Sequence, residues 1–309
     1  MRPVTSAHNM QMRMLLVLFV LLLQPFALAD TATPTETREA HGGHAILLEQ
    51  YTATWCDSCA TIDPWVTDFA DSHSSRVERV ALHPNDHDPF GNPLTTERIA
   101  LKQVEHQLQL PTFWFDGQGE LQGAVSQSLL ENELRSAEAN RADWIGMSVW
   151  WDSWENSPHD DIHRFHLNID EDLPPDAIIT VFRLETLEMT SEIANNGIDV
   201  HHDVATQMIS FSPNGSVLDS FDGVHGWDIS TGNLYSEGGI PVYTLETYGE
   251  VDGFVTVIED NVGVRGAIGI SNEEMPRKAE NNRNLAMFFL VGAVSYTHLR
   301  AHETREDLG

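Results

Sequence analysis

Two closely spaced cysteines constrain this chain more than any other feature of its sequence. Cys56 and Cys59 are the only cysteines among 309 residues, and two residues separate them. A disulfide between them would close almost no loop, so it would add little of the stabilisation that a structural cross-link provides. The pair is therefore predicted to be redox-active. An inert bridge and a metal site with two thiolate ligands are the alternatives.

The cysteines lie between a predicted strand and a predicted helix. Residues 45–51 form an apolar run of strand length, and apolar residues recur at helical spacing across residues 60–71. Because a helix N-terminus favours a thiolate, Cys56 is expected to make the first attack on a substrate. Cys59, one turn further into the helix, would then resolve the mixed disulfide. Trp55 would cover one side of this site.

Two patterns divide the remaining chain. Residues 45–137 predict the order strand, helix, strand, helix, strand, strand, helix, which implies a small mixed sheet with helices on both faces. The second of these helices is expected over residues 96–107, and Ser128 with Glu131 is expected to cap the last one. From residue 141 to residue 280, short runs of alternating polarity separated by turn residues predict an antiparallel β-sandwich.

Residues 45–137 resemble the thioredoxin superfamily. The resemblance rests on the W-C-x-x-C motif, on Pro64 five residues after the second cysteine, and on the segment Leu110-Pro111-Thr112. It implies an α/β thioredoxin-like domain over 44–139, followed here by the all-β domain over 141–280. It also implies that Cys56 and Cys59 are catalytic. A cis Leu110–Pro111 bond is expected, and the resemblance implies that the substrate-binding residues are Trp55, Leu110, Pro111 and Thr112.

Two residues depart from the pattern of that superfamily. Its members often bury an acid six residues before the first cysteine, and this position is occupied by Gln50, beside Glu49. Asp57 lies between the cysteines, where its charge should oppose a thiolate on Cys56. Both differences affect the balance between the dithiol and disulfide states.

The two ends of the chain suggest export and possible anchoring. Basic residues, an apolar run over 14–23 and the sequence Ala27-Leu28-Ala29 predict a signal peptide over 1–29, with a flexible leader over 30–43. The apolar run 285–294 is interpreted as a truncated C-terminal membrane segment, or as a short amphipathic tail. Residues 295–309 are suspected to be an artefactual tail. The expected location is extracytoplasmic, either secreted or at the cell surface.

The charge composition excludes one class of partner. With 47 acidic and 17 basic side chains, the formal net charge of −30 would repel nucleic acid. The histidine and aspartate residues over 83–88 are interpreted as a solvated polar loop rather than as a metal site. A second cluster over 159–166 is likewise not expected to bind a metal, and no organic cofactor is expected. A tryptophan-rich stretch over 144–154 is interpreted as packing rather than as a binding patch.

The resulting prediction is thiol–disulfide exchange on exported proteins. The partners would be exported protein thiols or disulfides and a redox partner that supplies or accepts electrons, with membrane contact through the C-terminus. Two alternatives remain open: a non-catalytic extracellular binding protein built on a thioredoxin scaffold, and a copper-handling chaperone that uses the two thiolates.

Overall fold

The computed structural model describes most of the chain between residues 33 and 272. The described ranges are 33–85, 87–102, 106–141, 143–155, 161–189, 196–221, 227–232 and 242–272. The predicted signal peptide, the run 285–294 and the tail 295–309 lie outside them. Within these ranges, no helix combines the length and the apolar character that crossing a membrane requires.

One antiparallel sheet has five strands. Their spatial order is β1 (Glu36–Gly42), β6 (Met147–Trp154), β7 (Ile162–Ile169), β12 (Val242–Tyr248) and β11 (Asp228–Gly232). Strand β1 falls within the segment that the sequence predicted to be a flexible leader. It pairs with β6 in continuous register from Glu36–Ser153 to Gly42–Met147. The backbone of these leader residues is therefore held by sheet hydrogen bonds.

The second sheet has nine strands and draws on both halves of the chain. Its order is β14 (Gly263–Ser271), β13 (Gly253–Asp260), β8 (Ile178–Glu188), β9 (Val200–Phe211), β3 (Val77–Leu82), β2 (Ile46–Tyr51), β4 (Thr112–Phe115) and β5 (Gln118–Gln122), with β10 (Val217–Phe221) also paired to β9. Strands β2 and β3 are parallel. Strands β3 and β9 meet through the parallel pair Ala81–Val204, which joins the two halves.

The predicted fold class, an α/β thioredoxin-like domain followed by a β-sandwich domain, is wrong. Strands make up 49% of the structure and helices 20%, and the described residues form two sheets and three α-helices. The predicted separation fails because β2–β5 continue into β9, β8, β13 and β14 within one sheet. Local sequence periodicity identifies strands but does not show that strands more than a hundred residues apart are neighbours.

The helices lie between or after the strands of the first half. They are α2 (Asp57–His73), followed by the 3₁₀ turn η1 (Ser74–Arg76), α3 (Pro93–Ala100) and α4 (Gln127–Asn140). Helix α3 begins at a proline and ends earlier than predicted. Helix α4 is capped by Ser126, whose Oγ accepts a hydrogen bond from Leu129 N, so the predicted Ser128 cap is wrong.

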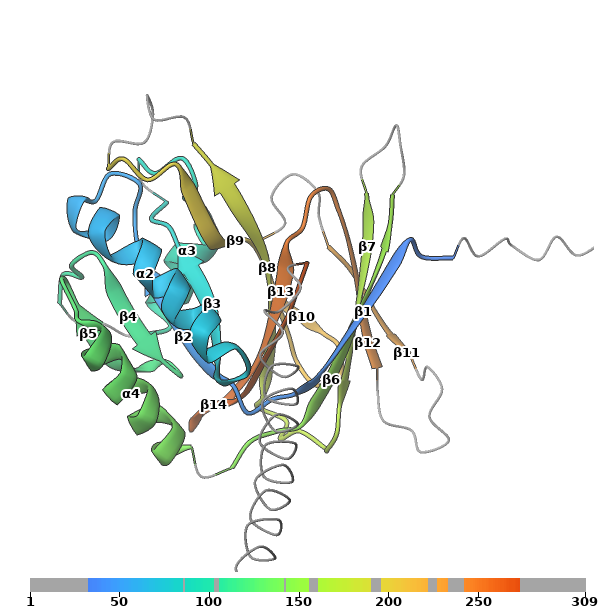
Figure 1. The fold of residues 1–309 in the computed structure, drawn as a ribbon. Helices are drawn as coiled ribbons and strands as arrows, with labels where there is room; N and C mark the ends of the chain where they lie inside the picture. The colour runs from blue at the N-terminus through green and yellow to red at the C-terminus, as the bar shows by residue number, and fades with distance from the viewer. Residues whose placement is uncertain are drawn as a thin grey trace, which may run out of the picture. The chain divides into compact units, whose positions relative to one another are not determined.

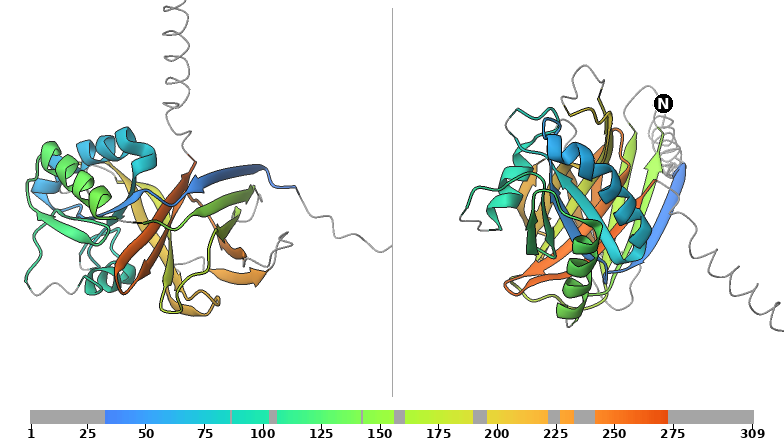
Figure 2. Two further views of the ribbon diagram at one scale, coloured as in Figure 1. Left: turned by 90° about the horizontal axis from the view of Figure 1, so that it is seen from below. Right: turned by 60° about the vertical axis from the view of Figure 1, so that its left-hand side comes forward.

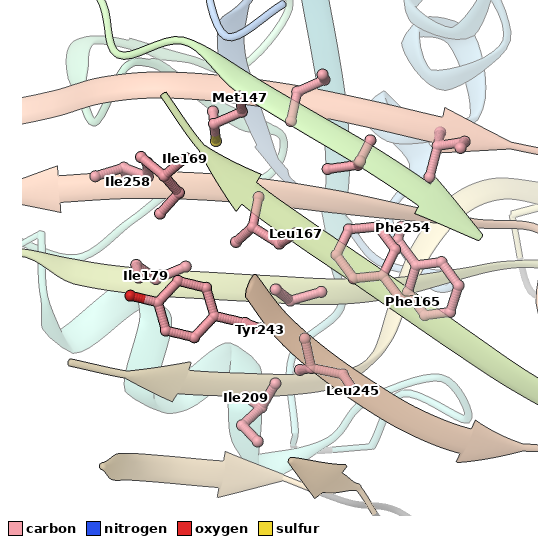
Figure 3. Close-up of a cluster of buried hydrophobic side chains, with 14 of the residues drawn as sticks. Met147, Phe165, Leu167, Ile169, Ile179, Ile209, Tyr243, Leu245, Phe254 and Ile258 are labelled. Atoms are coloured by element: carbon pink, nitrogen blue, oxygen red, sulfur yellow. The ribbon is translucent and has the colours of Figure 1, made fainter. Parts of the chain in front are cut away.

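The largest buried cluster fills the space between the two sheets (Figure 3). Strand β6 illustrates this arrangement. Its buried residues Met147, Val149 and Trp151 alternate with partly exposed neighbours, so every second side chain points inward. They pack with residues of the nine-stranded sheet such as Ile209 and Phe254. Burial of this apolar surface holds the sheets together.

Strands β2–β4 have helices on both faces (Figures 1 and 2). On one face, α2 and α4 pack on Ile46 and Leu48 of β2 and on Phe113 and Phe115 of β4. On the other face, Leu94 of α3 belongs to the cluster that contains Leu47, Val80 and several residues of β8, β9 and β13. The start of α2 is thereby fixed at the end of β2, where the cysteines lie.

Candidate redox site

Cys56 is the N-cap residue of α2. Its backbone is extended, with φ −91° and ψ 110°, and its Sγ accepts a hydrogen bond from Cys59 N at 3.1 Å. An N-cap acceptor satisfies a backbone N–H that has no partner within the helix. The sulfur thus occupies the place where the helix dipole is positive, so negative charge on this atom would be favoured.

The two cysteines form a disulfide whose halves differ in exposure. The Cα atoms are 5.2 Å apart. Cys56 is 7% exposed, whereas Cys59 is fully buried. With Ala53 they form a small buried cluster against which Leu110 packs. An attacking group from outside therefore meets Cys56 first.

An open pocket adjoins Cys56. Its volume is about 910 Å³. One wall comes from the loop and first turn around the cysteine, with Trp55 44% exposed at its edge. Residues 106–110 also line the pocket, and Tyr51 and Ile99 contribute apolar surface. Cys56 is thus one of the residues that line an open pocket.

The predicted substrate-binding residues take different places around this pocket. Trp55 and Leu110 line it together with Cys56. Pro111 and Thr112 are buried beside it, and the Thr112 hydroxyl donates a hydrogen bond to Gln109 O. The expected cis bond between Leu110 and Pro111 is confirmed.

Two side chains that sequence analysis did not assign to the redox site hold the loop before Cys56. The carboxylate of Asp88 accepts a hydrogen bond from Thr54 N at 2.7 Å. Asn196, from the connection between β8 and β9, donates from its side chain to Ala53 O at 3.2 Å. No local motif identifies Asn196, because its partner is 143 residues away in the sequence.

A buried carboxyl group lies one turn after Cys59. Asp63 accepts hydrogen bonds from Gln50 Nε2 and Thr52 Oγ1, each at 2.6 Å. Burial raises its pKa, although these bonds and Arg79 oppose the shift. The position expected to hold an acid is thus occupied by Gln50, which instead binds an acid from the helix.

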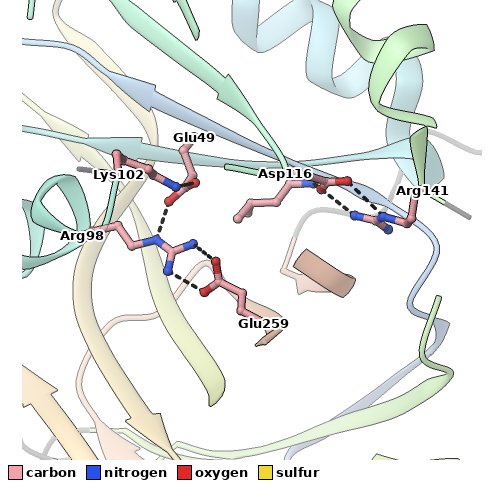
Figure 4. Close-up of polar contacts among 7 residues, drawn as sticks. Glu49, Arg98, Lys102, Asp116, Arg141 and Glu259 are labelled. Carbon is pink, nitrogen blue, oxygen red and sulfur yellow. Dashed lines mark hydrogen bonds and ion pairs between the residues drawn. The ribbon is translucent and has the colours of Figure 1, made fainter. Parts of the chain in front are cut away.

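Glu49 points to the other face of the sheet and has two cationic partners (Figure 4). Its carboxylate contacts Arg98 and Lys102, and the side chains of all three are at least 95% buried. Burial alone would raise the pKa of Glu49, but the two cations outweigh it and hold the pKa below its usual value. Arg98 also binds Glu259 of β13 at 2.6 and 2.9 Å.

Described residues of both histidine clusters are buried, namely His83, Asp88, His163 and His166. His83 and Asp88 are buried and paired, with 3.2 Å between Nδ1 and Oδ1, so the interpretation of both as solvated loop residues is wrong. His163 accepts a hydrogen bond from the buried Trp151 indole. Asp86, His159 and Asp160 lie outside the described residues. Among those described, no group of three or more His, Cys, Asp or Glu side chains is arranged to hold a metal ion.

Comparison with known proteins shows similarity of fold. No family model and no curated protein matches the sequence. Among solved structures, the chain is similar to HBP35 of Porphyromonas gingivalis, with 16% identity and a TM-score of 0.51, over 74% of this chain and 75% of that one. A protein of Agrobacterium tumefaciens gives 12% identity and a TM-score of 0.46, over 76% of this chain and 97% of that one. At this identity, the likeness to HBP35 concerns the fold alone.

Proposed function

We propose that this protein catalyses thiol–disulfide exchange on exported proteins through Cys56 and Cys59. The observation that carries the proposal is the place of the disulfide, at the N-terminus of α2 beside an open pocket. A disulfide in such a position can be attacked from solvent, and the thiolate that it releases can be stabilised by the helix.

The reaction consists of two exchanges that conserve electrons. A thiolate of a substrate dithiol attacks Cys56 Sγ, the Cys56–Cys59 bond breaks, and the Cys59 thiolate leaves and takes up a proton. The second substrate thiolate then attacks the substrate sulfur of the mixed disulfide and releases Cys56 as a thiolate. The substrate is oxidised by two electrons and the protein is reduced. The reverse sequence reduces a substrate disulfide.

Two groups suit the proton and charge changes of this reaction. The backbone N–H of Cys59 points at Cys56 Sγ and would stabilise its thiolate. Asp63 lies one helical turn beyond Cys59, and burial raises its pKa, which makes this carboxyl a better proton carrier than an exposed aspartate. We assign Asp63 the proton transfer with Cys59.

Trapping with single cysteine variants tests the function. Cys59→Ser leaves the attacking sulfur but removes the resolving one, so mixed disulfides with substrate should accumulate on Cys56. Cys56→Ser should neither exchange nor trap, since the remaining thiol is buried. Non-reducing gels after challenge of the reduced variants with an oxidised substrate protein give the readout.

Other outcomes would favour a different function. If both variants trap substrate equally, or if both keep full exchange activity, Cys56 and Cys59 do not work as an attacking and a resolving thiol. Absence of exchange in the wild-type protein would favour the binding-protein alternative. Stoichiometric Cu(I) binding by the reduced wild-type protein without exchange would favour copper handling.

A further inference from the structure

The peptide groups before Cys56 are held by residues from two distant segments. Thr54 is almost fully buried, its N–H donates to Asp88 Oδ2, and its carbonyl accepts from Asn196 N at 3.2 Å. The preceding carbonyl, Ala53 O, accepts from Asn196 Nδ2. The backbone N–H and carbonyl of Thr54 are thus hydrogen-bonded to residues from two different segments of the chain.

The bond to Ala53 is close to the reacting sulfur. Ala53 O also accepts the backbone N–H of Cys56 at 3.2 Å, so Asn196 and Cys56 share one carbonyl. Asn196 is itself oriented, because its Oδ1 accepts a hydrogen bond from Ile198 N at 3.1 Å. Because both the oxygen and the nitrogen of this amide are hydrogen-bonded, its orientation is fixed. It can therefore hold the Ala53 carbonyl, which in turn orients Cys56.

Asp88 supports the same loop from the other side. Its Oδ1 accepts a hydrogen bond from Phe90 N at 3.0 Å and contacts His83, while Oδ2 binds Thr54. Burial would raise the pKa of Asp88, but the hydrogen bond with His83 and the bonds from the backbone keep it below its usual value. The carboxylate therefore stays charged and remains a strong acceptor for Thr54 N–H.

We propose that Asn196 is a positioning residue for Cys56, supplied by the second half of the chain. The inference rests on the proposed function. In the reduced protein the covalent link to Cys59 is gone, and the loop bonds then keep Cys56 Sγ at the helix N-terminus. Loss of the Asn196 amide would let the sulfur leave this position. The pKa of the Cys56 thiol should rise as a result, and exchange at neutral pH should slow.

The test uses two substitutions at one site and a matched control. Asn196→Ala removes the bond to Ala53 O, while Asn196→Ser is too short to reach this carbonyl but keeps an acceptor for Ile198 N–H. Asn272 provides the control because it binds two consecutive carbonyls in the same way, with its N–H on Asp252 O and its amide on Val251 O. Asn272→Ala therefore removes a similar bond away from the cysteines.

Two measurements separate positioning from general stability. The pH dependence of alkylation of the reduced full-length protein reports the Cys56 thiol pKa and needs no substrate protein. The rate of exchange with a model protein disulfide reports function. Both Asn196 variants should exchange about threefold to tenfold more slowly than the wild-type protein, with a higher thiol pKa. Asn272→Ala should change neither, even if its unfolding temperature falls as far.

The results distinguish the inference from the function on which it rests. If the Asn196 variants match Asn272→Ala in thiol pKa and in exchange rate, the positioning role is wrong although the function stands. If the wild-type protein exchanges no disulfide, the function is wrong, while the alkylation profile still decides whether Asn196 positions Cys56. If the Asn196 variants do not fold under conditions where Asn272→Ala does, the amide is a structural support, and the positioning role is rejected.

Discussion

Arg98 of α3 and Glu259 of β13 form a bidentate ion pair across 161 residues of sequence. The Arg98 side chain is 1% exposed and also contacts Glu49, whereas the Glu259 side chain is 22% exposed. Helix α3, strand β2 and strand β13 are therefore connected through one buried cation. The two carboxylates differ in burial, so they should differ in their contribution to stability.

Glu49→Gln should destabilise the protein far more than Glu259→Gln. The first substitution leaves Arg98 and Lys102 buried with one countercharge fewer, which costs about 3–5 kcal/mol. The second removes a partner that reaches solvent and should cost about 1 kcal/mol. Urea unfolding of both variants provides the measurement. Equal urea midpoints for the two variants would mean that the deeper burial of Glu49 does not increase its contribution to stability.

Two adjacent tryptophans should respond differently to truncation. Trp151 is 2% exposed, contacts Phe254 with 5.1 Å between ring centroids, and donates to His163. Trp150 lies on the other face of β6, stacked on His166. Trp151→Ala should cost about 3–5 kcal/mol because it opens a cavity between the sheets. Trp150→Ala should lower the stability clearly less. Thermal unfolding of the two variants is the measurement, and a lower unfolding temperature for Trp150→Ala than for Trp151→Ala would contradict the prediction.

Partial burial of Glu78 should make the protein lose stability as the pH rises from acid values to about 8. Burial, opposed by a hydrogen bond from Gly269, raises the pKa of Glu78 from 4.5 to about 8. The folded state therefore holds a proton that the unfolded state releases, and stability falls as pH rises from about 4.5 to about 8. Glu78 is partly exposed, so solvent screening reduces the effect. Glu78→Gln should therefore raise the free energy of unfolding at pH 8 by about 1–3 kcal/mol. The gain should vanish at pH 4, as urea titrations at both pH values would show.

His201 should produce the opposite dependence. Burial, followed by the influence of His83, lowers the pKa of His201 from 6.5 to about 4. The unfolded chain then binds a proton that the folded chain excludes, so stability is lost as pH falls from about 6.5 to about 4. This loss is about 3 kcal/mol. His201→Phe keeps an aromatic ring beside Phe90. This variant should lose much less of its free energy of unfolding between about pH 6.5 and pH 4 than the wild-type protein. The control variant His41→Phe changes an exposed histidine and should behave like the wild-type protein.

Local structure near the cysteines was predictable from the sequence. The apolar run before Cys56 forms β2, and the helical spacing after Cys59 forms α2, because both patterns depend on neighbouring residues. Many strands of the second half were also predictable from alternation, as Phe165 and Leu167 in β7 illustrate. The spacing of apolar residues, at period two in strands and period 3.6 in helices, depends only on residues close in sequence. It therefore predicts these elements without knowledge of the fold.

The relations between distant segments were not predictable. Strand β1 looked like a leader because its residues are polar, and its partner β6 begins more than a hundred residues later. Asp88 looked like part of a solvated loop, yet Thr54 and His83 enclose it. Asn196 carries no signal of its own. Such residues acquire their role from neighbours that only the folded chain supplies.

The distance in sequence between the cysteines and Asn196 also orders events during synthesis. A chain that emerges from the ribosome exposes Cys56 and Cys59 well before the residue that bonds to Ala53 O, which lies 143 positions away from its partner. Strand β3 likewise cannot pair with β9 through Ala81 until Val204 has been synthesised. The cysteine loop of the nascent chain is therefore unsupported until most of the polypeptide has been made, and early oxidation of the pair would take place without its final surroundings.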